Sequence, residues 1–95
     1  MRRAANIDSN QPEIVAALRG VWATVTPTHT AGAGFPDLVV GYRSVNYLME
    51  IKDGALPPSA RQLNATQVEW HADWRGQVAV VNDVSEALAV IGVKA

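Results

Sequence analysis

The stretch Gly34-Phe35-Pro36-Asp37, followed by Glu50-Ile51-Lys52, decides how this 95-residue chain is interpreted. An apolar run begins directly after Asp37 and ends at Gly41-Tyr42, and a second run covers residues 47–52. Both runs have the composition of β-strands, and the polar link over residues 43–46 is typical of a turn. The sequence therefore predicts a β-hairpin with charged residues at its open end.

The predicted hairpin brings three ionisable side chains together. We expect Tyr42 to lie opposite Tyr47, and this antiparallel register places Asp37 opposite Lys52. Glu50 and Lys52 share a face because side chains alternate along a strand. Directly opposed residues also share a face. The side chain of Asp37 should therefore join this pair.

Two adjacent carboxylates and an amine suit a metal-dependent hydrolytic site. The carboxylates of Asp37 and Glu50 would repel each other without a cation between them. Mg²⁺ takes oxygen ligands, and the carbonyl of Ile51 offers another oxygen. A metal held there would polarise a phosphoryl oxygen and activate water, while Lys52 would orient that water or neutralise developing charge. The alternative is a strand end closed by an ordinary ion pair, which contributes little on a surface.

These motifs resemble the PD-(D/E)XK nuclease signature. From about Asn10 to Leu88 the chain is similar to the virus-type replication-repair nuclease (VRR-NUC) domain, a small stand-alone kind found in phages and bacteria, and to small Holliday-junction-resolvase-like domains. The similarity rests on pieces that occur in order: an early helix carrying Glu13, then residues 34–37, 50–54 and 63–67.

The resemblance implies a DNA endonuclease that depends on Mg²⁺ or Mn²⁺. It implies that Asp37 and Glu50 bind metal, that Lys52 is catalytic and that Glu13 completes the acidic cluster. Gln67 matches a glutamine that often lines the site. The substrate could be a junction, a flap, a single strand or a duplex. The alternative is an inactive nuclease-fold module that binds DNA or a protein partner.

Three of the candidate residues also have structural explanations. Glu13 lies in the first turn of its helix, where a carboxylate suits the helix dipole. Gln67 stands three residues after Asn64, so the two predict a capping box. His29 belongs to a loop over residues 27–35, and we expect it to be a surface residue sooner than a phosphate contact.

The composition is typical of a globular protein with a single domain. The chain is 48% hydrophobic and 18% charged, without cysteine, and carries a net charge of −1. We expect a flexible basic arm over residues 1–9 and one domain over residues 10–95. The absence of cysteine fits a reducing cytoplasm, here of a bacterial or phage-infected cell. No apolar stretch approaches the ~20 residues that span a bilayer, so no membrane is expected.

The order of expected elements is α-β-β-β-α-β-α. Helices are predicted over residues 11–19, from the Asn64 cap to Gly76, and over residues 86–91, and strands over 21–26, 38–42, 47–52 and 77–81. The last strand is almost wholly apolar, which predicts burial on both faces. A helix between the third and fourth strands makes a parallel crossover. The expected fold class is α/β: a mixed central sheet with helices on both faces, as in restriction-endonuclease-like cores.

The apolar residues exceed what one small core obviously needs. They are Trp22, which we expect on the apolar side of the first helix, Trp70, Trp74 and the run over residues 87–91. Tryptophans at helical spacing usually pack inward, so core or interface anchors are expected in preference to a base-stacking platform. Junction-cleaving relatives in the resembled family work as two-fold dimers. We therefore expect a homodimer, with completion of the monomer core as the alternative.

Overall fold

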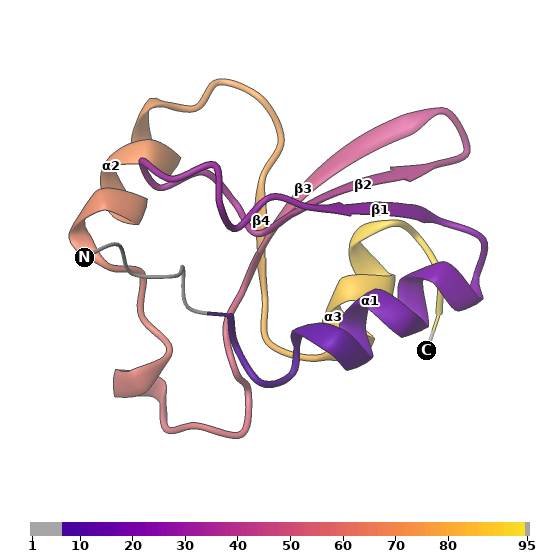
Figure 1. Cartoon of the computed structure of the whole chain (residues 1–95), viewed down its shortest axis with the longest axis horizontal. Coiled ribbons are helices and arrows are strands. Elements are labelled where there is room, and N and C mark those ends of the chain that lie inside the picture. Colours follow the sequence, from indigo (N-terminus) through magenta and orange to yellow (C-terminus); the bar gives the residue numbers. More distant parts are fainter. Residues whose placement is uncertain (1–6, 95) are drawn as a thin grey trace.

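Four strands form one mixed sheet in the computed structural model, which describes residues 7–94 (Figure 1). The strands lie in the order β1-β2-β3-β4. Their bounds are β1 Thr24–Pro27, β2 Leu38–Tyr42, β3 Val45–Ile51 and β4 Ala79–Val81. The first three pair antiparallel, whereas β4 runs parallel to β3 after a crossover. The mixed α/β sheet predicted from the sequence is confirmed.

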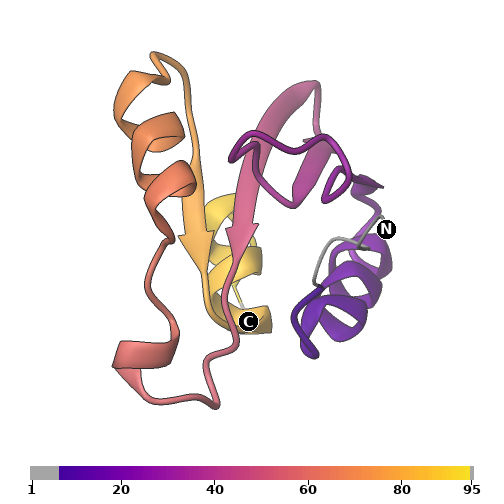
Figure 2. The same cartoon turned by 60° about the vertical axis from the view of Figure 1, so that its left-hand side comes forward.

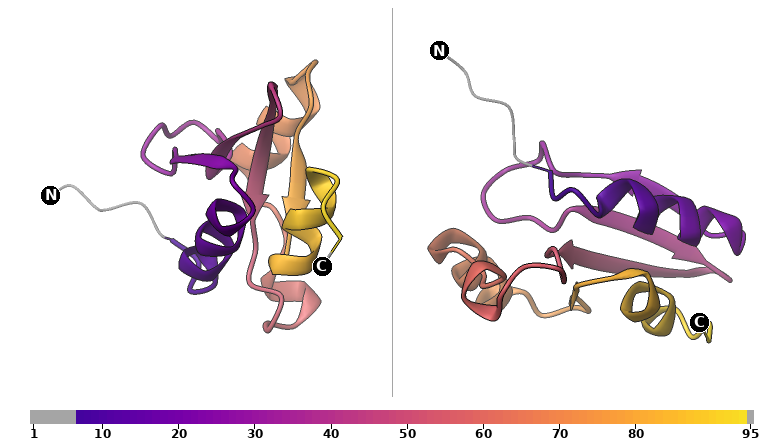
Figure 3. Two further views of the ribbon diagram at one scale, coloured as in Figure 1. Left: turned by 90° about the vertical axis from the view of Figure 1, so that its right-hand side faces the viewer. Right: turned by 90° about the horizontal axis from the view of Figure 1, so that it is seen from below.

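The helices lie at two places around this sheet. They are α1 Gln11–Gly20, α2 Ala65–Asp73 and α3 Val84–Val90, with a short 3-10 turn, η1, at Pro58–Ala60. Helices α1 and α3 pack against each other below one face of the sheet, and α2 lies beyond the far end of the strands (Figures 1 and 3). No helix within residues 7–94 is long and apolar enough to cross a bilayer.

The core fills the space between the sheet and the α1–α3 pair. Its fully buried members come from both layers and include Ile14 and Leu18 of α1, Leu38 and Val40 of β2, Met49 and Ile51 of β3, Val81 of β4 and Ala87 of α3. The other face of the sheet leaves Val80 41% exposed. The prediction that the last strand is buried on both faces is therefore wrong, because α1 and α3 share one face.

The hairpin between β2 and β3 turns more tightly than expected. Residues 43 and 44 have φ angles of 50° and 66°, which fits a two-residue turn of type I′. Tyr42 consequently lies opposite Val45, two residues short of its predicted partner. A shift of two residues preserves the alternation of faces. The same register, continued past the end of β2, places Asp37 opposite Glu50.

The segment between α1 and β1 also departs from the prediction. Trp22 has a φ of 71° and is 91% exposed, so it belongs neither to the apolar side of α1 nor to the core. β1 therefore begins at Thr24 and not at Val21. The left-handed turn at Trp22 follows the end of α1 and reverses the chain onto the sheet.

The segment before α1 is tied to the ends of two strands. Residues 1–6 of the predicted basic arm lie outside the described residues. Ser9, which also belongs to that predicted arm, donates its Oγ hydroxyl to Asp53 Oδ2 at 2.9 Å. Asn10 makes no side-chain cap on α1. Its Nδ2 instead donates to the carbonyl oxygens of Lys52 and Asn82, at 3.1 and 3.0 Å. Asn10 therefore fastens α1 to the chain where it leaves β3 and β4.

Asn10→Ala is expected to lower the free energy of unfolding by about 1–3 kcal/mol, because two carbonyl contacts at a part-buried position are lost. Urea unfolding followed by circular dichroism measures this difference. Asn46→Ala, at an exposed position near the hairpin turn, is the control and should change stability by less than about 0.5 kcal/mol. Equal stability of the two variants would contradict the role given to Asn10.

Candidate active site

Asp37 is held at the point where β2 begins. Its Oδ2 accepts a hydrogen bond of 2.8 Å from the backbone N–H of Ile51. On the other side, Thr28 donates its backbone N–H to the carbonyl of Asp37 and its hydroxyl to the carbonyl of Pro36, both at 2.7 Å. The carboxylate therefore closes the open end of the hairpin through a backbone hydrogen bond, not through the ion pair expected of a plain strand end, and it also faces the site cavity.

Glu50 is a buried carboxylate on the same face. The residue is 1% exposed, and its Oε2 accepts a 2.9 Å hydrogen bond from Gln67 Nε2. Lys52 Nζ lies 3.8 Å from the same oxygen. The other oxygen, Oε1, is buried and has no hydrogen-bond partner among the described residues. An unpaired carboxylate oxygen in a polar pocket is costly unless another group binds it.

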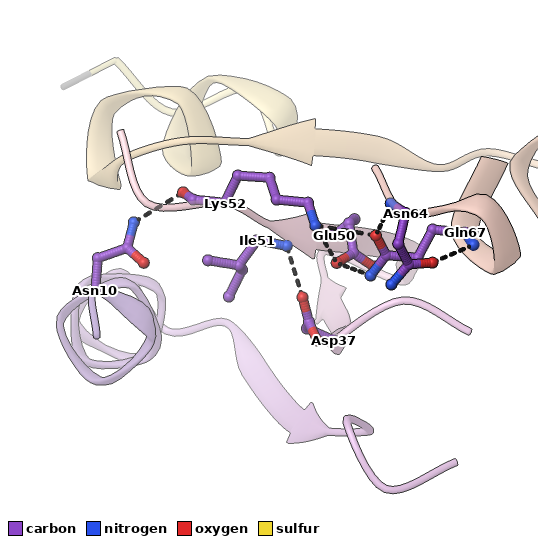
Figure 4. Close-up of polar contacts among 7 residues, drawn as sticks. All are labelled: Asn10, Asp37, Glu50, Ile51, Lys52, Asn64 and Gln67. Carbon is purple, nitrogen blue, oxygen red and sulfur yellow. Dashed lines mark hydrogen bonds and ion pairs between the residues drawn. The ribbon is translucent and has the colours of Figure 1, made fainter. Parts of the chain in front are cut away.

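Gln67 joins the start of α2 to both charged groups (Figure 4). It completes a capping box with Asn64: Asn64 Oδ1 accepts from the N–H of Gln67, and Gln67 Oε1 accepts from the N–H of Asn64. The same Oε1 accepts from Lys52 Nζ at 2.9 Å. Since the cap fixes which end of the amide is oxygen, the NH₂ end faces Glu50. The predicted capping box is therefore confirmed, and the same amide also lies between Glu50 and Lys52.

The pKa of Glu50 is raised to about 8. Burial is the main cause, followed by Asp37, with which only the protonated form of Glu50 can share a hydrogen bond and which repels the ionised form. Lys52 opposes the shift, and Asp8 adds to it. Ionisation of both carboxyl groups is therefore unfavourable unless a cation lies beside them, as expected for neighbouring acids.

These side chains border one cavity of about 350 Å³ between the loop before β2, the end of β3 and the start of α2. The candidates Asp37, Glu50, Lys52 and Gln67 all line it. His29 lines it too, and its buried Nδ1 has no partner among the described residues. His29 therefore faces the site and not the open surface that we expected.

Glu13 is not part of this cavity. It is exposed and borders a separate hollow with Asn10, Asp53 and Asn82. The neighbouring Ile14 is fully buried in the core. Successive side chains of a helix point about 100° apart, so Glu13 is directed elsewhere. The expected acidic cluster of Glu13, Asp37 and Glu50 is not assembled.

A different carboxylate, Asp8, lines the cavity in place of Glu13. Burial raises its pKa; Lys52 lowers it, and Asp37 and Asp53 raise it further. Asp8 lies within the predicted arm of residues 1–9, and no motif around it indicates a site. Only the anchoring of Ser9 and Asn10, which depends on residues far along the chain, places it here.

The loop before β2 must approach α2 closely to form the cavity wall. A Cβ added to Gly34 would lie 2.7 Å from the carbonyl oxygen of Thr66 and 2.9 Å from Trp70 Cβ. Gly34 also has a φ of +83°, which disfavours other residues. The Gly-x-Pro-Asp motif therefore combines a close approach to α2 with the placement of Asp37.

The donor set fits a hard divalent cation. Within residues 7–94, no three His, Cys, Asp or Glu side chains gather closely enough to form a complete metal group. The available donors are the carboxylates of Asp37 and Glu50, including the unpartnered Oε1, and the carbonyl of Ile51 beside them. Mg²⁺ commonly uses one or two carboxylates and completes its shell with water and substrate oxygens.

The raised pKa of Glu50 predicts how the stability of the chelator-treated protein depends on pH. The folded-state pKa of about 8 exceeds the ordinary value of 4.5, so the native state binds the proton more tightly. Between these values the free energy of unfolding should fall as pH rises, by about 1.4 kcal/mol for each pH unit at most. Glu50→Gln should flatten this slope and be more stable than the unmodified protein near pH 8.

Urea unfolding in chelator between about pH 5 and pH 8 measures the effect. Glu13→Gln is the matched control, because it removes an exposed carboxylate and should keep the slope. A slope that persists unchanged in Glu50→Gln would assign the titration to another group.

Comparison with known proteins tests the fold. No protein-family profile and no curated protein matches the chain. A solved structure described as a VRR_NUC domain superposes with a TM-score of 0.62 and 23% sequence identity, over 85% of this chain and 88% of that one. At this identity the likeness shows the fold. The chain therefore has the fold of a VRR_NUC domain, as the two motifs predicted.

Proposed function

We propose that this chain is a Mg²⁺- or Mn²⁺-dependent phosphodiesterase that cleaves DNA. The observation that carries the proposal is the buried Glu50, whose Oε1 lacks a partner and whose Oε2 is linked through Gln67 to Lys52. An ion pair that served only to close the hairpin would have no need of an unpartnered carboxylate beside a cavity. The nuclease-type fold supports the same conclusion.

Asp37, Glu50 and the Ile51 carbonyl would hold the metal, with Asp8 near enough to add negative charge to the site. When bound, the cation supplies Lewis acidity toward a phosphoryl oxygen and a water of lowered pKa. Asp37 is already oriented by Ile51, and Glu50 by Gln67. Both carboxylates would therefore lose little freedom on binding.

Lys52 is placed to neutralise charge on the phosphate. One of its N–H donors is taken by Gln67 Oε1, and its side chain retains 14% exposure toward the cavity. An ammonium has three donors. The remaining donors could reach a phosphate oxygen or the attacking water, and charge that develops there in the transition state would be stabilised.

A second candidate is a non-catalytic module that binds nucleic acid or a protein. It is favoured by the lack of a complete three-side-chain metal group within residues 7–94. Calorimetry with Mn²⁺ separates the candidates, because only the enzyme requires that Asp37 and Glu50 bind the ion.

Cleavage of labelled single-stranded, flapped, branched and duplex DNA with Mg²⁺ or Mn²⁺ tests the proposal directly. Asp37→Asn keeps an acceptor for Ile51 but removes a charge, and should lower the cleavage rate by at least ~10²-fold. Lys52→Met should lower kcat by a similar factor while Mn²⁺ affinity is retained, because its role belongs to the transition state. Glu13→Gln should cleave like the unmodified protein. Inactivity of the unmodified protein on every substrate, or full activity of Asp37→Asn, would refute the proposal.

Assembly into a homodimer is proposed as well, but with a smaller set of surfaces than the sequence suggested. Ala87, Leu88 and Ile91 belong to the core of the single chain. Exposed apolar surface for such a contact remains at Trp22, which is 91% exposed. Sedimentation at micromolar concentration should give twice the mass of one chain; a monomer would favour flap or single-strand cleavage over symmetric junction cleavage.

A further inference from the structure

A second hollow, of about 320 Å³, adjoins the proposed active site. It is lined by Ala33, Thr66, Glu69, Trp70, Asp73 and Trp74. Thr66 lines both hollows, and Ala33 is the chain neighbour of Gly34 in the site wall. We propose that this hollow binds an unpaired nucleobase of the strand whose phosphate occupies the active site. The inference rests on the proposed function and narrows its substrate to DNA with an unpaired base beside the cleaved bond.

The aromatic side chains form a continuous series from the site outward. Phe35, which lines the active-site cavity, meets Trp70 edge to face with ring centroids 5.4 Å apart. Trp70 in turn stacks on Trp74, with centroids 4.7 Å apart and planes 18° from parallel. A base stacked beside this pair would extend an arrangement that the protein already makes.

These tryptophans are not core residues. None of the residues of α2 is buried, and Trp74, which follows the helix, is 42% exposed. Its Nε1 donates to the carbonyl of Gln77 at 2.9 Å, so the ring is held in place. A rigid, half-exposed indole can bind a base without much loss of its own freedom.

The charges around the hollow favour a base over a phosphate. Glu69 and Asp73 lie four residues apart on α2, and both are exposed. No lysine or arginine of the described segment lines this hollow. Carboxylates repel the backbone of DNA, but they accept hydrogen bonds from exocyclic amino groups such as N4 of cytosine. The hollow should therefore prefer cytosine or adenine to thymine.

A paired base cannot enter such a hollow. In a duplex its faces are covered by neighbouring bases, and extrusion costs a few kcal/mol. Single strands, flaps and branch points present bases that are already free. The proposed platform would therefore select DNA structure through its stacking surface, with no need for a broad basic face.

Binding of fluorescein-labelled oligonucleotides in chelator tests the platform without any catalytic step. Trp74→Ala should weaken the binding of single-stranded oligo-dC by about 5- to 150-fold, the usual range for loss of one stacked base. Trp74→Phe keeps an aromatic face but loses the bond to Gln77, and should bind nearly as well as the unmodified protein. Val45→Ala, which trims an exposed apolar side chain at the start of β3 next to the hairpin turn, is the control and should bind like the unmodified protein.

An abasic scan identifies the contact. One abasic position in the oligonucleotide should weaken binding to the unmodified protein, with no further loss in Trp74→Ala, as a double-mutant cycle requires. The ratio of the affinity for oligo-dC to the affinity for oligo-dT should be smaller in Asp73→Asn than in the unmodified protein.

If Trp74→Ala binds every oligonucleotide normally, the platform is refuted while metal-dependent cleavage stands. If the unmodified protein never cleaves DNA but Trp74→Ala loses binding, the platform stands and the enzyme proposal fails. If Trp74→Ala instead converts a dimer to a monomer, the surface is an interface between two copies and the inference is overturned.

Discussion

The buried carboxylate of Glu50 is the constraint on which the arrangement of this molecule depends. Burying a charge costs several kcal/mol unless it is paired and hydrogen-bonded, and here a second carboxylate, Asp37, increases that cost. The protein compensates on one side only: Gln67 donates to one oxygen, and Lys52 lies 3.8 Å from it. The other oxygen is left without a partner in the described residues. The protein alone therefore leaves part of the free-energy cost of this carboxylate uncompensated, at a position where a bound cation would lower it. Functional sites commonly carry such a cost in stability.

The side chains that contact the charged groups also stabilise local structure. Gln67 caps α2 and orients both Glu50 and Lys52, so the same amide that starts the helix sets the geometry of the charged pair. Figure 2 shows α2 alongside the segment that leads into β4, the neighbour of β3 in the sheet. Asp37 likewise closes the hairpin through Ile51 while it faces the cavity. Removing either side chain would change both structure and chemistry. Substitutions that keep the hydrogen bond and alter the charge are therefore the informative ones.

Much of this arrangement could be predicted from the sequence because it follows from alternation. The expected hairpin register was wrong by two residues, yet Asp37, Glu50 and Lys52 still share a face because an even shift preserves it. The capping box on α2 is equally local. The positions of Asp8 and Glu13 are not local. They depend on Asn10, whose contacts lie 42 and 72 residues away in the chain, and no periodicity in the sequence encodes them.

The exposure of the α2 tryptophans could not be predicted for a related reason. Helical spacing of Trp70 and Trp74 indicates a common face, but it does not tell whether a sheet covers that face. Here α1 and α3 already fill the covered face of the sheet, and α2 stands beyond its end.

The exposed aromatic surface also matters because the net charge of −1 is unfavourable for the DNA binding that we propose. Binding through phosphates requires many cations and weakens steeply with salt, whereas stacking requires neither. If the site holds one phosphate through a metal and one base through indole rings, as we propose, it needs no strongly basic surface.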